Sequence, residues 1–385
     1  MTGFALYRLP YEGQVTLVAQ KEGEPLELPS IAALNGQTGF VVAPFSISPS
    51  CPLVLIRPDV VQTFPSYREC AFVGAGFSLA LRRPLSSGET TSLNRDTYAD
   101  DFRRFFAGLS DGRFSKLVLS RCAEVQSEED AQPLTLFQRA CEMYPRMFIS
   151  LVCTPQSGMW LTATPEILLE GIGNQWRTIA LAGTMKLEGD DLLGEGEHMT
   201  WSTKNIQEQR YVATYLMNCL ERVADDIHEE GPRTVRAANL VHLRSDFTFT
   251  LSDNERVGDV LQLLHPTPAV CGLPKQDAYD FILSNEHTPR LYYSGFMGPL
   301  NLRHQPSDIS PQPSDISPQP SDLRLQPSDL RLQTHLYVSL RCMQVTDTQY
   351  RLYAGGGLLK DSVEEQEWME TEAKMETMRR VLKTQ

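Results

Sequence analysis

Short runs of β-forming residues, separated by turn formers, constrain the fold of this chain more than any other feature of its sequence. Four such runs fall within the first hundred residues and begin at Phe4, Val15, Gly39 and Leu53. Runs of this length and composition are typical of strands that end at turns. We therefore expect a largely antiparallel sheet in a strand-rich N-terminal part, residues 1–95.

The rest of the chain mixes further strands with helices. Strands are predicted over residues 115–121, Met147–Thr154, Met159–Thr162, Tyr292–Met297 and Leu336–Met343. A short helix is expected over residues 97–110. Strands and helices do not alternate regularly, and no glycine-rich nucleotide loop follows a strand, so the pattern favours an α+β fold.

Two longer helices are predicted from apolar periodicity. One starts near Thr203 and the other lies at the C-terminus, and each presents one apolar stripe at helical spacing. The stripes consist of Val212, Leu216, Cys219, Val223 and Ile227 in the first helix and of Trp368, Met375, Met378 and Leu382 in the second.

A low-complexity segment interrupts the last third of the chain. Residues 305–333 repeat a seven-residue unit that begins at prolines 306, 313, 320 and 327. A seven-residue period can indicate a coiled coil, but a proline in every unit forbids a continuous helix. We predict a disordered or loosely extended surface loop that arose by tandem duplication.

Charge and composition exclude several classes of protein. The 385 residues carry a formal net charge of −13, which argues against nucleic-acid binding. No stretch approaches the roughly 20 apolar residues of a membrane span, and the N-terminus lacks the pattern of a signal peptide. None of the eight cysteines forms a Cys-x-x-Cys pair, which favours reduced, mostly buried thiols. We expect a cytoplasmic protein.

The C-terminal segment holds the first candidate site. Residues 351–357, Arg-Leu-Tyr-Ala-Gly-Gly-Gly, form a predicted strand that ends in three glycines, and the following helix carries Glu367, Glu370 and Lys374. These three side chains lie at positions i, i+3 and i+7, so they share one helix face. Taken alone, this is a solvated face with an ordinary Glu–Lys pair.

Other motifs precede this segment along the chain. They are Ser-Lys-Leu-Val-Leu-Ser-Arg (115–121), Thr-Pro-Glu-Ile-Leu-Leu-Glu (164–170), Ala-Leu-Ala-Gly-Thr (180–184), the helix with Glu208, Val-His-Leu-Arg-Ser (241–245), Leu-His-Pro-Thr-Pro-Ala-Val (264–270), Pro-Arg-Leu-Tyr-Tyr-Ser-Gly (289–295) and Leu-Arg-Cys (340–342). Over roughly residues 100–380, this set resembles the chorismate-utilising enzymes, which include isochorismate, salicylate, anthranilate and aminodeoxychorismate synthases. The resemblance implies one enzyme domain over residues 1–385, with antiparallel sheets packed as a sandwich, flanking helices and a central active-site cleft.

The resemblance assigns two catalytic roles. Lys116 matches the lysine that activates water, and Glu166 matches the general acid that protonates the departing hydroxyl. A lysine is a poor base at its usual pKa of about 10.4, so its site must lower that pKa by desolvation or nearby cations. Glu166 must be partly protonated or able to exchange protons with solvent.

The remaining site residues are also implied by the resemblance. Glu208 and Glu370 match carboxylates that bind Mg²⁺, and Glu367 would contribute through a bound water. Arg341 matches the arginine that binds the pyruvyl carboxylate of chorismate. The other expected substrate-binding residues are Gly183, Thr184, His242, Ala269, Tyr293, Gly355 and Lys374.

Two positions favour water as the nucleophile. Ammonia-using relatives usually carry glutamine at the position of Lys116, and aminodeoxychorismate synthases carry a nucleophilic lysine at the position of Ala182. We therefore expect conversion of chorismate to isochorismate for menaquinone or siderophore biosynthesis, by a monomer or weak oligomer that needs no glutaminase partner. Salicylate synthase is the first alternative, an ammonia-dependent anthranilate synthase component the second, and a non-catalytic relative the third.

Three positions depart from the family pattern. Cys271 stands where many relatives have a smaller residue, and Asn205 and Gln209 replace an acidic residue and a histidine near the expected metal-binding Glu208. The last two substitutions predict weaker metal binding.

Overall fold

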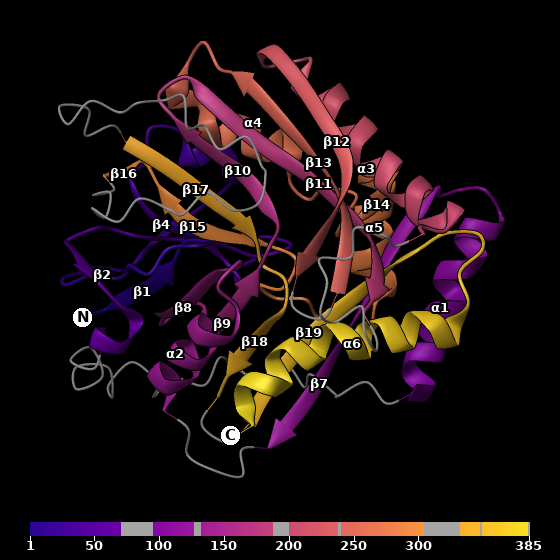
Figure 1. The fold of residues 1–385 in the computed structure, drawn as a ribbon, viewed down its shortest axis with the longest axis horizontal. Helices are drawn as coiled ribbons and strands as arrows, with labels where there is room; N and C mark the ends of the chain where they lie inside the picture. The colour runs from indigo at the N-terminus through magenta and orange to yellow at the C-terminus, as the bar shows by residue number, and fades with distance from the viewer. Residues whose placement is uncertain are drawn as a thin grey trace.

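The computed structural model describes residues 1–70, 95–126, 132–187, 200–237, 240–303, 332–346 and 349–383. These residues form two antiparallel sheets with helices on their outer faces (Figure 1). The α+β sandwich expected from the sequence is therefore confirmed. The predicted loop over residues 305–333 lies outside the described residues, except for Leu332 and Gln333, which begin a strand.

Within the described residues, the first sheet has nine strands in the order β14-β7-β19-β18-β9-β8-β1-β2-β6. Their bounds are β1 Gly3–Arg8, β2 Val15–Gln20, β6 Val60–Phe64, β7 Lys116–Gln126, β8 Phe148–Thr154, β9 Gly158–Thr164, β14 Gly272–Leu273, β18 Cys342–Val345 and β19 Gln349–Leu358.

The second sheet has the described order β12-β13-β11-β10-β17-β15-β4-β5-β3, and β16 pairs with β17. Its strands are β3 Leu26–Leu28, β4 Gly39–Ala43, β5 Leu53–Ile56, β10 Ile167–Ile172, β11 Gln175–Lys186, β12 Asp225–Ala237, β13 Leu240–Thr250, β15 Phe296–Leu300, β16 Leu302–Arg303 and β17 Leu332–Val338. Strands from the first 70 residues thus extend both sheets.

The α-helices of the described chain are α1 Arg95–Ser110, α2 Pro133–Met143, α3 Thr203–Leu220, α4 Val257–Leu264, α5 Lys275–Asn285 and α6 Glu364–Leu382. Apolar residues of α2 and α6 pack on the outer face of the first sheet, and those of α3 and α4 pack on the outer face of the second. No helix in the described part of the chain is long and apolar enough to span a membrane.

Apolar side chains on both faces of the strands explain this layered arrangement. In β1, Phe4 and Leu6 join the cluster under α2 and α6, whereas Ala5 and Tyr7 join the cluster between the sheets. This division follows because successive side chains of a strand point to opposite faces. All eight cysteines are free and buried, as expected.

Two predicted elements have different bounds in the structure. The apolar stripe predicted for this helix continues to Val223 and Ile227, but α3 ends at Leu220, and Ile227 lies in β12. Backbone pairing of β12 with β13 replaces the helix at this point. The strand predicted over Tyr292–Met297 begins only at Phe296, after a turn in which Ser294 has φ 61°.

The strand predicted over Leu336–Met343 is in fact two strands in different sheets. β17 ends at Val338 in the second sheet, and β18 begins at Cys342 in the first. Arg341 lies at the break with φ 47°, a left-handed backbone conformation that is uncommon for residues other than glycine.

A second passage between the sheets lies beside this break. The chain leaves β9 in the first sheet and enters β10 in the second through Pro165 and Glu166. The amide of Val338 donates to the carbonyl of Glu166 at 2.9 Å, and the amide of Ala163 donates to the carbonyl of Arg341 at 3.2 Å. These two hydrogen bonds therefore link the two segments that cross between the sheets.

The core between the sheets should dominate stability. The ring of Phe148 is fully buried and stacks on Tyr337 with centroids 4.3 Å apart. We expect Phe148→Ala to lower the free energy of unfolding by about 3–5 kcal/mol, measured by urea denaturation. Leu283→Ala, at a half-exposed position on α5, should change it by less than about 0.5 kcal/mol. Equal effects of the two substitutions would contradict this assignment of the core.

Candidate active site

A cavity opens where the two passages between the sheets meet the ends of β11, β13 and β19. Ten of the thirteen predicted site residues line it: Glu166, Gly183, Thr184, Glu208, His242, Ala269, Tyr293, Arg341, Gly355 and Lys374. The other three, Lys116, Glu367 and Glu370, are not among its lining residues. Lys116 and Glu370 are ion-paired to the lining residues Glu208 and Lys374, respectively.

Glu166 supplies a buried carboxyl group to this cavity. Its surface is only 3% exposed, because it sits in the passage from β9 to β10. Burial raises the pKa of Glu166 to about 8, against the opposing effect of the positive charges of Lys116, Lys374 and Arg341. At neutral pH this carboxyl group is therefore mostly protonated and can donate a proton.

Arg341 supplies a buried cation. Its guanidinium donates to the carbonyl of Ala237 at 3.3 Å and to Nε2 of His242. No carboxylate forms an ion pair with it among the residues that the structure describes. Burial lowers the pKa of Arg341 to about 10, yet the group remains charged at neutral pH. A buried cation without an anionic partner is a receptor for an anionic ligand.

His242 is neutral, and its ring both donates and accepts a hydrogen bond. Burial, followed by the charges of Arg341 and Lys374, lowers the pKa of His242 well below its usual value. Its Nδ1 lies 3.2 Å from the carbonyl oxygen of Gly183, which assigns the proton to Nδ1 and leaves Nε2 to accept from Arg341. The ring therefore orients the guanidinium.

A β-bulge in β11 shapes another part of the cavity wall. The register of β11 against β13 shifts between Ala182 and Thr184, and Gly183 at the bulge has φ 72°. The buried side chain of Gln209 spans this irregularity, since it accepts from the amide of Ala182 at 2.9 Å and donates to the carbonyl of Ala180 at 3.1 Å. Gln209 thus ties α3, which carries Glu208, to the cavity wall.

Each of the three predicted metal-binding carboxylates is paired with a lysine. Glu208 Oε1 lies 2.9 Å from Nζ of Lys116, and Glu370 Oε1 lies 2.7 Å from Nζ of Lys374. The third contact joins Glu367 to Lys204 of α3. Burial alone would raise the pKa of Glu208, but the neighbouring ammonium groups outweigh it and hold this pKa below its usual value.

The glycines of β19 allow these carboxylates to approach the strand. A Cβ atom at position 357 would lie 2.1 Å from Oε1 of Glu208, which is impossible without displacing it. A Cβ atom at position 356 would lie 3.2 Å from Oε2 of Glu367 and 3.8 Å from Oε1 of Glu370. Gly356 and Gly357 therefore leave room for the three carboxylates beside this strand.

The residues present fit a magnesium ion in their chemistry. Within the described ranges, no three acidic, histidine or cysteine side chains already form a metal-binding group. However, Oε2 of Glu367 is buried without a hydrogen-bond partner among the described atoms, and burial together with the charge of Glu370 raises the pKa of Glu367 to about 6. An oxygen-coordinated divalent cation would relieve this repulsion.

Sequence reasoning missed part of the site. Apolar and aromatic residues complete the cavity wall: Val118, Leu181, Val270, Leu340 and Tyr353. Lys204, the partner of Glu367, was also missed. Isolated apolar residues in strands carry no signal that distinguishes a cavity wall from a core, and nothing in its own spacing marks Lys204 as a partner of α6.

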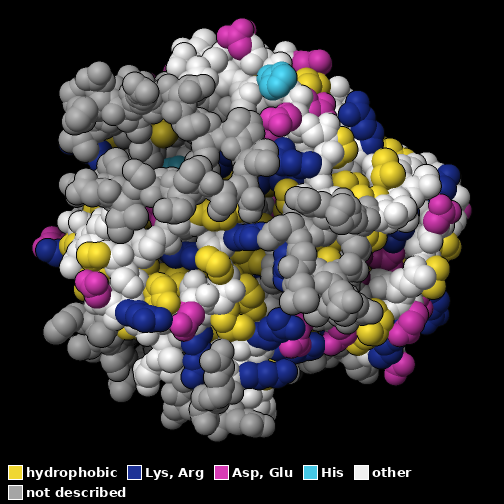
Figure 2. All heavy atoms as spheres, in the orientation of Figure 1, with side chains coloured by type: hydrophobic (Ala, Val, Ile, Leu, Met, Phe, Trp, Pro, Cys, Tyr) yellow, Lys and Arg dark blue, Asp and Glu magenta, His cyan; other side chains and the backbone are white. Residues whose placement is uncertain are grey.

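The face of the molecule in Figure 2 carries mixed charge. Over the lower part of the face in Figure 2, Lys and Arg side chains lie beside Asp and Glu side chains. Inside the cavity, Arg341 carries a positive charge that no described carboxylate pairs with, and this charge is available to an anionic ligand. This explains how a chain with a net charge of −13 can present a cationic site.

A buried acid, a buried cation and the carboxylate of Glu208 line one cavity, an arrangement that suits an enzyme acting on a carboxylated small molecule. The family model described as "Chorismate binding enzyme" matches residues 78–307 and 328–383. The chain therefore belongs to the family of chorismate-binding enzymes.

Individual relatives agree with this family. Isochorismate synthase EntC of Escherichia coli (strain K12) is 26% identical over 266 residues, which are 68% of this chain and 61% of that protein. The salicylate biosynthesis isochorismate synthase of Pseudomonas aeruginosa is 29% identical over 315 residues, 79% of this chain and 59% of that protein. In both cases the match spans about three-fifths of the relative.

A solved structure shows the same fold. MenF, the menaquinone-specific isochorismate synthase from Escherichia coli, aligns with a TM-score of 0.72 and 20% sequence identity, over 99% of this chain and 89% of that one.

The raised pKa of Glu166 predicts a pH-dependent stability. Between pH 4.5 and 8 the unfolded carboxyl is ionised while the folded one holds its proton, so this group makes stability fall as pH rises through that window. We expect Glu166→Gln to become progressively more stable relative to the unsubstituted protein, by up to about 1.4 kcal/mol per pH unit, in urea titrations. A stability difference that stays constant from pH 5 to 8 would contradict the raised pKa.

Proposed function

We propose that this protein is an isochorismate synthase, which converts chorismate to its isomer isochorismate. The observation that carries the proposal is the convergence on one cavity of the protonated Glu166, the unmatched cation Arg341 and the Lys116–Glu208 pair. Chorismate carries two carboxylates and a ring hydroxyl, so it needs cations to bind and an acid to release that hydroxyl.

In the proposed reaction, Lys116 leaves its ion pair with Glu208 and, as a neutral amine, accepts a proton from water as the water oxygen bonds to ring carbon C2. The ring double bonds shift, the C4–oxygen bond breaks, and the proton of Glu166 leaves with the departing hydroxyl as water. One water is consumed and one released, so substrate and product are isomers. Arg341 binds the pyruvyl carboxylate, in an orientation fixed by His242.

The ring carboxylate would be bound on the side of the three glutamates. Glu208 and Glu370, with Glu367 through a water, would hold Mg²⁺, which when bound offsets the charge of that carboxylate. Lys116, Lys374 and Lys204 pair with these glutamates. Binding of the cation would therefore require these contacts to rearrange. The product would feed menaquinone or siderophore biosynthesis.

Product identification tests the proposal. Purified protein incubated with chorismate and Mg²⁺ should yield isochorismate, detected by chromatography and mass spectrometry. Salicylate with pyruvate would instead identify a salicylate synthase, and an aminated product in ammonium salt would identify an ammonia-dependent synthase. Either result, or no turnover, would refute the proposal.

A variant of Lys116 serves as the matched negative control for that assay. Because this lysine is fully buried at the start of β7, Lys116→Ala should reduce turnover by a factor of at least about 100, with chorismate still bound. Leu283→Ala, on the outer surface of α5, should retain full turnover. If Lys116→Ala retained full turnover as well, the role of Lys116 as base would be wrong.

The proposed metal site can be tested without measuring activity. We expect Glu370→Gln to weaken Mn²⁺ binding, observed by electron paramagnetic resonance, by at least about tenfold, because one charged ligand is lost. Glu376→Gln is the control on the same helix, since Glu376 contacts only Arg380 and Lys383 in the described ion pairs. Equal Mn²⁺ affinity in both variants would remove Glu370 from the ligand set.

A further inference from the structure

A second buried arginine, Arg290, lies behind the cavity wall and does not contact the cavity. Only 4% of its surface is exposed. Its Nε and Nη2 donate to the two carboxylate oxygens of Glu286 at 2.6 and 2.8 Å, so the pair is bidentate. The guanidinium also lies over the ring of Phe45, 4.3 Å from the centroid. A fork–fork pair of this kind has a fixed geometry.

The remaining donors of Arg290 reach two separate parts of the cavity wall. Nη1 donates to the carbonyl of Val270 at 2.6 Å, and Nη2 donates to the carbonyl of Val118 at 2.7 Å. Both valines line the cavity. Val118 lies two residues after Lys116 in β7, and Val270 directly follows Ala269. One guanidinium therefore joins the strand of the proposed base to the turn that faces the substrate.

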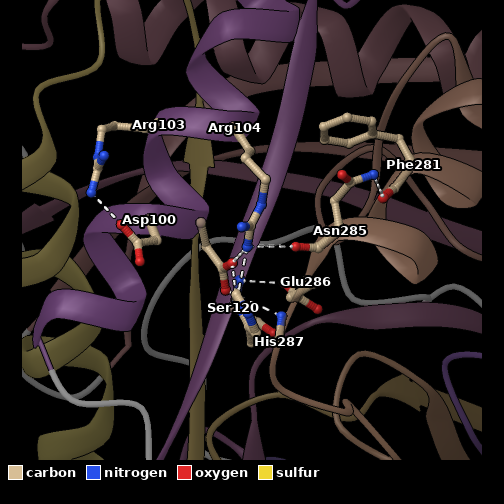
Figure 3. Close-up of polar contacts among 9 residues, drawn as sticks. Asp100, Arg103, Arg104, Ser120, Phe281, Asn285, Glu286 and His287 are labelled. Atoms are coloured by element: carbon tan, nitrogen blue, oxygen red, sulfur yellow. Dashed lines mark hydrogen bonds and ion pairs between the residues drawn. The ribbon is translucent and has the colours of Figure 1, made fainter.

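Glu286 extends this connection along β7. Its Oε1 accepts from the amide of Ser120 at 2.6 Å, and Ser120 is paired across the sheet with Gly355 of the cavity. Figure 3 shows the Glu286 contact with Ser120, next to His287 and Arg104. The buried Asp101 of α1 accepts from the amide of His287 at 3.2 Å, so α1 also holds this segment.

We propose that Arg290 is a positioning residue of the active site: with Glu286 it fixes the distance between β7 and the turn over residues 267–271, and so sets the cavity wall against the substrate. This inference rests on the proposed function. The adjacent backbone contact from the amide of Val118 to the carbonyl of Cys271, at 2.7 Å, spans the same junction. Backbone pairing of β14 with Lys116 and Leu117 holds one end of this junction, and Arg290 extends the connection to Val118 and Val270, which line the cavity.

Arg290→Lys separates positioning from charge. A lysine keeps the positive charge but cannot donate to Glu286, Val118 and Val270 in the same planar arrangement. We expect kcat/KM for chorismate to fall about 10- to 100-fold and chorismate affinity, measured by calorimetry, to weaken about tenfold. Mn²⁺ affinity should stay unchanged, because the proposed metal ligands lie on α3 and α6.

The matched control is Arg177→Lys. Arg177 pairs with Glu170 across β10 and β11, and neither residue lines the cavity. This variant should lose stability while kcat, KM and chorismate affinity remain those of the unsubstituted protein. If Arg290→Lys likewise changed only the melting temperature, or if it lost Mn²⁺ binding together with activity, the positioning role would be overturned.

Two further measurements keep the inference testable. If Arg290→Lys does not fold, Glu286→Gln, which preserves shape and removes the charge, should show the same weakened chorismate affinity; unchanged affinity in that folded variant would overturn the proposal. If the unsubstituted protein binds chorismate but forms no isochorismate, the proposed function fails, while the calorimetric comparison still decides whether Arg290 shapes the site.

Discussion

The burial of several carboxylates beside one strand is the constraint on which the site depends. Glu208 and Glu367 approach the glycines of β19 from α3 and α6, where solvent cannot stabilise their charges. A buried charge is strongly unfavourable unless it is paired. Lysines from β7 and α3 supply that pairing, and they link β7, α3 and α6 into one unit.

Glu166 and Arg341 have no ion-pair partner among the described residues, and both lie where the chain crosses between the sheets. Glu166 remains mostly protonated because burial disfavours its ionised form, and Arg341 retains its charge with only neutral hydrogen-bond partners among the described residues. Burial of the Glu166 carboxyl group and burial of the Arg341 charge both lower the stability of the folded state. The apolar clusters of the sandwich on both faces of each sheet supply the stability that tolerates them.

The two passages between the sheets also explain why distant segments make one site. Glu166 and Arg341 are far apart in sequence, but the hydrogen bonds at Val338 and Ala163 place their backbones side by side. Behind them, Arg290 joins β7 to the turn after α4. The site is therefore supported on strands and their ends rather than on long loops, which limits the freedom of the side chains that face the ligand.

The sequence by itself determined the α+β class, most strand and helix positions, and a set of ordered motifs whose resemblance indicated the family. Side-chain alternation in β1 and apolar periodicity in α6 are local properties, so they can be read from neighbouring residues. Only the tertiary structure decided that the segment around Arg341 breaks into two strands, that α3 ends before Val223, and that Lys204 pairs with Glu367. These outcomes depend on backbone pairing and charge compensation between segments far apart in the chain, which no local pattern records.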